Sequence, residues 1–144
     1  MTVKSSLTTA VLLLATAAGL PGWSAAKPLG PVSNAQSRAA GLGGTGCDWM
    51  ARQNGPVLLA MADDKAVVSI RGKVVILSPG RGARDLFPFT FNRWKAPAND
   101  LTITVRKLAI ARRIGTETLA SRTDLVLVQA GRRTVLHGFM ECGS

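Results

Sequence analysis

Short runs of apolar and β-branched residues, separated by turn-forming residues, dominate the chain from residue 47 onward. In residues 101–106 the side chains of Leu101, Ile103 and Val105 alternate with polar ones, so one face can meet a core while the other meets water. Further short apolar runs cover residues 56–61, 66–71, 73–77, 124–129 and 134–139. Short strands at near-regular spacing are typical of antiparallel sandwiches and small barrels. The pattern predicts one all-β domain over residues 47–144.

Two hairpins are predicted within this domain. Arg71-Gly72 separates two β-branched runs, and glycine tolerates the positive φ that a tight hairpin turn needs. The second hairpin joins residues 124–129 to residues 134–139 through Ala130-Gly131-Arg132-Arg133, which gives it a basic tip. Residues 108–122 are open to two interpretations. A helical turn is one of them, but Gly115 and the following threonines favour strand and loop.

The first 26 residues have the pattern of a secretory signal. Lys4 precedes an apolar stretch over residues 7–20, and small residues end the segment at Ala26. Cleavage there leaves 118 of the 144 residues, enough for one domain with a core. We therefore expect a periplasmic or secreted protein with no transmembrane segment in the mature chain.

Residues 27–46 are rich in glycine, proline, alanine and serine, and we expect a flexible lead-in. The sequence GLGGTG at residues 41–46 has the glycine spacing of a dinucleotide-binding loop. That motif requires a strand before it and a helix after it, whereas here the lead-in precedes it and Cys47 follows. The spacing is therefore interpreted as accidental, and no cofactor is expected.

The two cysteines, Cys47 and Cys142, are predicted to form a disulfide. An exported chain meets an oxidising compartment, where an even pair usually becomes a bridge. Closing so long a loop stabilises the fold by about 4 kcal/mol in the chain-entropy model. A metal site is the alternative. It is disfavoured because the cysteines are far apart and the chain has one histidine, His137, so no metal is expected.

The chain is strongly basic, with a formal charge of +10 that falls to about +9 once Lys4 leaves with the signal segment. Such an excess attracts anionic partners such as lipid headgroups, acidic polysaccharides or nucleic acid. The competing interpretation is that the basic surface serves solubility alone.

Cations and aromatic rings are mixed in residues 78–95. Phe87, Phe89 and Phe91 are two residues apart, so in an extended segment all three would face one way, and Pro88 favours an edge strand. We expect the rings in the core and the cations at the surface, since an unpaired buried charge is costly. An exposed aromatic strip stacking on sugars or bases is the alternative. The predicted binding residues are Arg81, Gly82, Ala83, Arg84, Arg93, Lys95, Arg132 and Arg133.

The sequence offers few groups for catalysis. His137 lies in a predicted strand, and its nearest acid in sequence, Glu141, would lie about 13 Å away along an extended chain. The adjacent Asp63 and Asp64 stand where a hairpin needs turn formers. We therefore expect a protein that is not an enzyme, with a small hydrolase as a minor alternative.

Several short pieces of the chain occur together in one known family. They are Cys47-Asp48, residues 72–77, Gly82-Ala83-Arg84, Trp94-Lys95 followed by residues 101–105, and the final Cys142. In these pieces the chain resembles the periplasmic and membrane-bound inhibitors of C-type lysozyme. The resemblance implies a small exported antiparallel β-barrel with cysteines at both ends. The family's inhibitory loop carries a serine where this chain has Arg81 and a tyrosine where it has Asp85.

Two functions therefore remain as expectations. The first is an exported, non-catalytic β-domain that binds an anionic lipid or glycan of the cell envelope through a basic surface. The second, implied by the resemblance, is inhibition of a lysozyme-like hydrolase by protein binding. C-type lysozymes are themselves strongly basic, so a partner chain near +9 is a poor electrostatic match, and the first function is favoured.

Overall fold

A computed structural model describes residues 27–87, 90–109 and 112–143. The predicted signal segment, residues 1–26, and two residues of the aromatic stretch, Pro88 and Phe89, lie outside the described residues.

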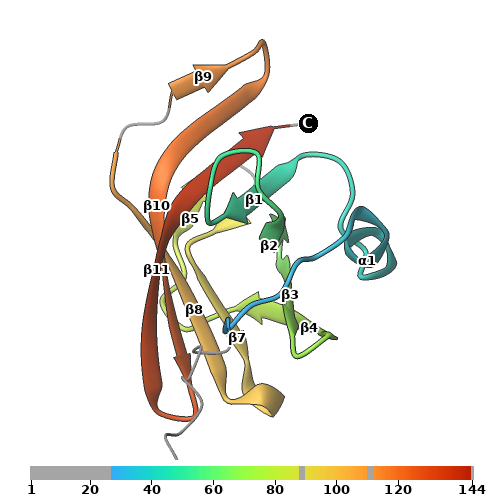
Figure 1. Cartoon of the computed structure of the whole chain (residues 1–144), viewed down its shortest axis with the longest axis vertical. Helices are drawn as coiled ribbons and strands as arrows, with labels where there is room; N and C mark the ends of the chain where they lie inside the picture. Colours follow the sequence, from blue (N-terminus) through green and yellow to red (C-terminus); the bar gives the residue numbers. More distant parts are fainter. Residues whose placement is uncertain (1–26, 88–89, 110–111, 144) are drawn as a thin grey trace, which may run out of the picture.

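Eight antiparallel strands form a closed barrel (Figure 1). Neighbours along the chain are neighbours in the sheet, and the last strand closes the barrel by pairing with both the first strand and the strand before it. This confirms the all-β prediction and selects a barrel over a sandwich. The barrel strands are β1 (Gly46–Met50), β2 (Val57–Ala62), β3 (Lys65–Ile70), β4 (Lys73–Pro79), β7 (Arg93–Ala96), β8 (Leu101–Lys107), β10 (Thr118–Gln129) and β11 (Arg132–Gly143).

The smaller elements lie at the ends and the outside of the barrel. They are α1 (Asn34–Ala39), the two-stranded sheet of β5 (Asp85–Phe87) and β6 (Thr90–Phe91), the 3-10 turn η1 (Pro97–Asn99), and β9 (Arg112–Ile114). Within the described residues no helix is long and apolar enough to cross a membrane.

Alternate side chains of the barrel strands point inward and fill the interior of the barrel. In β8 the alternation read from the sequence holds, with Leu101, Ile103 and Val105 buried and their neighbours facing outward. Trp49 and Trp94 are fully buried in the same cluster. The indole Nε1 of Trp49 donates a 2.8 Å hydrogen bond to the hydroxyl of Thr123, so this buried polar group is satisfied.

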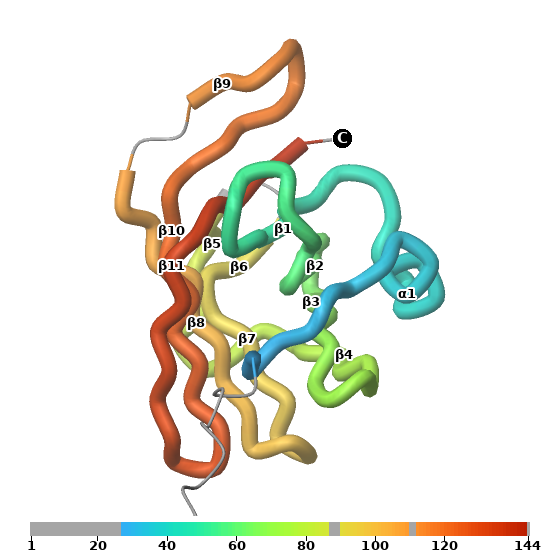
Figure 2. Tube along the Cα trace, in the orientation of Figure 1, coloured from blue at the N-terminus to red at the C-terminus, as the bar shows by residue number. Residues whose placement is uncertain are grey.

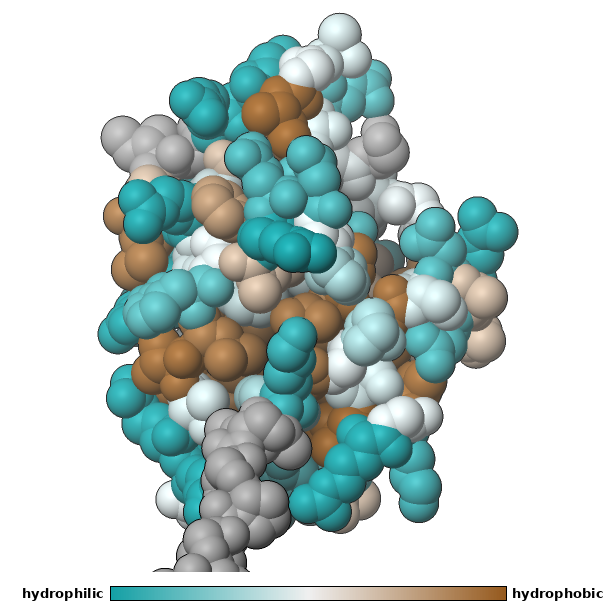
Figure 3. Space-filling model, in the orientation of Figure 1, coloured by the Kyte–Doolittle hydropathy of each residue, from teal (hydrophilic) through white to brown (hydrophobic). Residues whose placement is uncertain are grey.

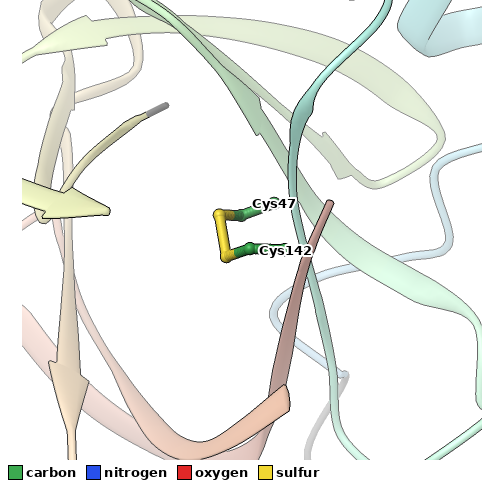
Figure 4. The surroundings of a disulfide bond; sticks show 2 residues. All are labelled: Cys47 and Cys142. Carbon is green, nitrogen blue, oxygen red and sulfur yellow. A yellow bond between two sulfur atoms is a disulfide. The ribbon is translucent and has the colours of Figure 1, made fainter. Parts of the chain in front are cut away.

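The disulfide between Cys47 and Cys142 is confirmed (Figure 4). The two residues lie directly opposite each other in the pairing of β1 with β11, and both are buried within the core. The bridge therefore locks the first barrel strand to the last one at the seam where the sheet closes.

Residues 27–46 pack against the barrel, which corrects the expected flexible lead-in. Ser33 begins α1 with a capping box, in which its side chain and that of Gln36 each accept the other's backbone N–H. Val32, Ala40 and Leu42 are buried against the outer face of β2 and β3. Figure 2 shows this segment running beside those two strands.

Both predicted hairpins are present. Arg71 and Gly72 adopt positive φ values of 51° and 76°, as a two-residue turn between twisted strands requires. The second turn consists of Ala130 and Gly131 alone, because Gln129 already pairs with Arg132. The expected basic tip is therefore wrong in detail: Arg132 and the residue after it belong to β11.

The ambiguous segment 108–122 contains strand and turn where it is described. Strand β9 pairs with residues 118–120 of β10, and this hairpin extends beyond the barrel wall (Figure 1). The helical alternative is wrong for residues 112–122.

The aromatic stretch is not one extended strand. Strands β5 and β6 pair with each other, so the chain reverses between Phe87 and Phe91. The premise of one extended segment is therefore wrong, and the side chains of Phe87 and Phe89 lie outside what the structure describes. Phe91 is half-buried and packs edge-on against Trp94, with their ring centroids 6.1 Å apart. This ring does anchor the loop to the core, as expected.

Candidate functional site

The outer face of strands β7, β8, β10 and β11 carries three cations beside apolar side chains. Because Trp94 is buried, its neighbours Arg93 and Lys95 face outward. From these two residues, the pairing of neighbouring strands defines two rows of outward-facing side chains across the sheet. One row runs from Arg93 through Thr104 and Val126 to Val135, and the other runs from Lys95 through Thr102 and Val128 to Arg133. We call these eight residues the basic outer face.

The basic outer face brings together three of the predicted binding residues from distant parts of the chain. Lys95 and Arg133 are three strands apart in one row, about 14 Å at the usual strand spacing. All three cations, Arg93 included, are exposed. A single anionic surface could therefore contact them together.

Four further predicted residues form a loop beside Arg93. Arg81, Gly82, Ala83 and Arg84, here called the basic loop, follow the end of β4. The guanidinium of Arg93 donates a 3.2 Å hydrogen bond to the carbonyl of Arg81. At the other end of the loop, the backbone N–H of Arg84 donates to the side chain of Asn92. These bonds tie the basic loop to the edge of the basic outer face.

The last predicted residue, Arg132, lies elsewhere. It shares the strand face of Leu136, which packs on the core, but it stands at the exposed end of β11 beside the turn. The sequence-predicted set therefore divides into the basic outer face, the basic loop and one separate arginine at the end of the barrel.

A buried carboxylate on the same outer side was missed by sequence reasoning. Asp124 is directly opposite Arg106 on β8 and His137 on β11. Its Oδ2 accepts a 2.8 Å hydrogen bond from Arg106, and its Oδ1 lies 2.7 Å from Nδ1 of His137. The Asp124 side chain is 4% exposed, whereas that of His137 is 80% exposed. The hydrogen bonds from Arg106 and then from His137 lower the pKa of Asp124.

The interpretation that His137 has no nearby acid is thus wrong. Glu141 is the nearest acid in sequence and lies on the same strand, whereas the hydrogen-bonded acid, Asp124, lies across the hairpin. The signal was present: a two-residue turn at Ala130-Gly131 places residue 137 opposite residue 124. Asp124 holds the imidazole of His137 on the outer side of the hairpin, and among the described side chains no serine, threonine or cysteine is hydrogen-bonded to that ring.

A second surface feature contains two carboxylates and one arginine, Arg38. A cavity of about 410 Å³ lies beside the disulfide and is lined by α1 together with β1, β2 and β11. Asp48 and Glu141, which are directly opposite each other on β1 and β11, both line it. Loss of hydration, and then the charge of Glu141, raise the pKa of Asp48. Where the chain is described, no three His, Cys, Asp or Glu side chains are grouped to hold a metal ion.

Apolar side chains also reach the surface. Val128 is 38% exposed on the basic outer face, and Val74 and Ile76 are exposed on β4. Figure 3 shows hydrophobic side chains gathered in the middle of its view, between hydrophilic ones above and below. Chemically, the arrangement places exposed cations beside apolar surface, which suits the binding of anions.

Comparisons with protein-family models, with curated proteins and with solved structures found no match to this chain.

Proposed function

We propose that the protein is an exported, non-catalytic β-domain that binds an anionic component of the cell envelope. The observation that carries this proposal is the register that aligns Lys95 and Arg133 in one row, with Arg93 beside them. The sheet holds the backbone of these cations in place, so the main chain need not reorder when a polyanion binds, and arginine can bind phosphate or carboxylate with two hydrogen bonds.

Two features support the proposed compartment. Residues 1–26 have the composition of a secretory signal, and the disulfide is compatible with an oxidising environment. The net positive charge adds long-range attraction to anionic envelope surfaces.

The test is adsorption to lipopolysaccharide and to an acidic glycan over a range of salt concentrations. We expect adsorption at low salt that weakens as ionic strength rises, because exposed charges are screened beyond about 10 Å at 0.1 M salt. Replacing Arg81 and Arg84 together by alanine should weaken adsorption and leave the melting temperature nearly unchanged, since both side chains are exposed. His137→Ala should leave adsorption at neutral pH intact. Absence of adsorption at low salt would contradict the proposal.

Inhibition of a lysozyme-like hydrolase is a second candidate. The observation that favours it is the position of the basic loop, which keeps Arg84 exposed at one end of the barrel next to Arg93. A panel of acidic and basic lysozymes separates the two functions. Inhibition at equimolar concentration, abolished by Arg84→Ala, would favour the inhibitor, whereas no inhibition across the panel would eliminate it.

A further inference from the structure

Apolar side chains face outward on two sides of the barrel. They are covered by another segment of the chain on one side and partly exposed on the other. On β2 and β3, Ala60 and Val67 are buried beneath the segment that contains α1. On β10 and β11, Val126, Val128 and Val135 have no such cover among the described residues, and Val128 is 38% exposed. We call these three residues the central valines.

Cations flank the central valines on two sides, with Arg93 and Lys95 on β7 and Arg133 on β11. Val126 and Val135 continue the row of Arg93, whereas Val128 lies between Lys95 and Arg133 in the other row. The basic outer face is therefore amphipathic, with a patch of β-branched apolar side chains on β10 and β11 and long cationic side chains on β7 and at Arg133. Arginine and lysine stems can extend beside such a patch while their charged ends stay in water.

The carboxylate of Asp124 borders this patch, but it should not repel a negatively charged surface. Asp124 lies in the adjacent row, but its two oxygens are taken up by Arg106 and His137. The side chain is almost fully buried, so these two groups stand between its charge and the solvent. An approaching anionic surface would meet the cations first.

We propose that the basic outer face docks onto a lipid surface that carries acidic headgroups. This inference rests on the proposed anion-binding function and names the partner. Apolar side chains can enter the boundary between headgroups and acyl chains while cations contact the headgroups, and the two contributions add. The eight residues of the face contain no aromatic ring, so the stacking that strengthens binding to sugars and bases is missing. The chemistry therefore favours a lipid over an acidic glycan or a nucleic acid.

The test compares vesicles with a soluble polyanion. Flotation with phosphatidylcholine vesicles containing phosphatidylglycerol measures lipid binding, and pure phosphatidylcholine vesicles show the requirement for charge. Heparin, a soluble acidic glycan, measures binding through charge alone. The variant V126T/V128T keeps β-branched side chains and every charge but makes the centre polar. The control V74T/I76T makes the same change on the exposed outer side of β4.

We expect V126T/V128T to bind the acidic vesicles about fivefold more weakly than the unaltered protein, because less apolar area enters the lipid boundary. Its heparin binding should be unchanged, which also shows that the variant is folded. V74T/I76T should match the unaltered protein in both assays. Equal vesicle binding by V126T/V128T, or tight heparin binding with no vesicle binding, would overturn the lipid inference and leave the proposed function standing. If the unaltered protein bound neither heparin nor acidic vesicles, the proposed function would fail, and this inference with it.

Discussion

His137 and Asp124 face each other across the β10–β11 hairpin, with the imidazole Nδ1 2.7 Å from the carboxylate Oδ1. The same carboxylate accepts a hydrogen bond from Arg106, so one buried acid holds side chains from two neighbouring strands. The contact links the three strands β8, β10 and β11 on their outer side.

The first prediction concerns Asp124 and pH. Its pKa in the folded state lies below the unfolded value, so ionisation of this group stabilises the fold at neutral pH. That contribution is present above about pH 4, the ordinary range for aspartate, and is lost as the pH falls through the lowered pKa. Asp124→Asn should therefore lower the melting temperature at pH 7, and the difference from the unaltered protein should shrink on acidification.

Asp64→Asn serves as the control, since Asp64 lies in the exposed turn between β2 and β3. Melting curves of the three proteins from pH 7 down to pH 2 make the comparison. A difference between Asp124→Asn and the unaltered protein that stays constant over this range would show that the carboxylate charge is not what stabilises the hairpin.

The second prediction concerns Asp48, whose ionisation should destabilise the fold, whereas that of Asp124 stabilises it. Its folded-state pKa is raised by loss of hydration and by Glu141, so ionisation costs stability at neutral pH and costs nothing below the unfolded pKa near pH 4. Asp48→Asn should stabilise the fold at pH 7 by less than about 1 kcal/mol, because Asp48 is exposed and solvent screens its repulsion by Glu141 directly opposite.

Urea unfolding at pH 7 and at pH 3.5 measures this effect. Glu141→Gln should give a gain of the same sign, and the double variant should gain less than the sum of the two single ones. If Asp48→Asn were destabilising at pH 7, the carboxylate would have a favourable partner, and the pair would not be repulsive.

The side chains and backbone packed around residue 138 leave room for glycine only. A Cβ added there would overlap the carbonyl oxygen of Met50 and the indole ring of Trp49, which fill the space beside β11. Gly138→Ala should therefore lower the free energy of unfolding by about 1–3 kcal/mol, the range for overpacked cores. Gly43→Ala is the control, because a Cβ there meets nothing within 4 Å. Denaturant unfolding checks both, and equal stability of the two variants would mean that the barrel seam is loosely packed.

The disulfide should stabilise the barrel strongly. Cys47 and Cys142 are 95 residues apart, so the bridge removes much of the unfolded chain's freedom, and its loss should cost about 4 kcal/mol. Unfolding of the protein with and without reductant, and of the double serine variant, measures this. Mass spectrometry of the non-reduced protein should find no free thiol, and two free thiols would contradict the bridge.

Local patterns in the sequence were sufficient for the barrel strands β2, β3, β4 and β8, the turn at Arg71-Gly72 and the cysteine pair. Alternation in residues 101–105 reports which side chains face a core, and it holds in the structure. Contacts between residues on neighbouring strands could not be predicted in the same way, because they depend on the register in which the strands pair. The Asp124–His137 pair becomes visible once the turn is shortened to two residues, which moves every cross-strand partner.

Two other features depended on tertiary packing. The segment before β1 looked flexible because it is rich in small residues, yet Val32 and Leu42 gain a binding surface only after β2 and β3 have paired. The capping box from Ser33 to Gln36 is nevertheless a local signal in the sequence for the start of a helix. The alignment of Lys95 with Arg133 required the order of four strands, which no local pattern gives.

The most direct test of the proposed function is elution from an immobilised polyanion in a salt gradient. The variant R93Q/K95Q/R133Q removes the cations of the basic outer face, and the variant R52Q/R71Q/K73Q removes three exposed cations elsewhere, so the two have equal net charge. If the basic outer face binds the polyanion, the first variant elutes at clearly lower salt than the second, and the second stays close to the unaltered protein. Elution of both variants at the same salt concentration would contradict the account, because net charge alone would then explain the binding.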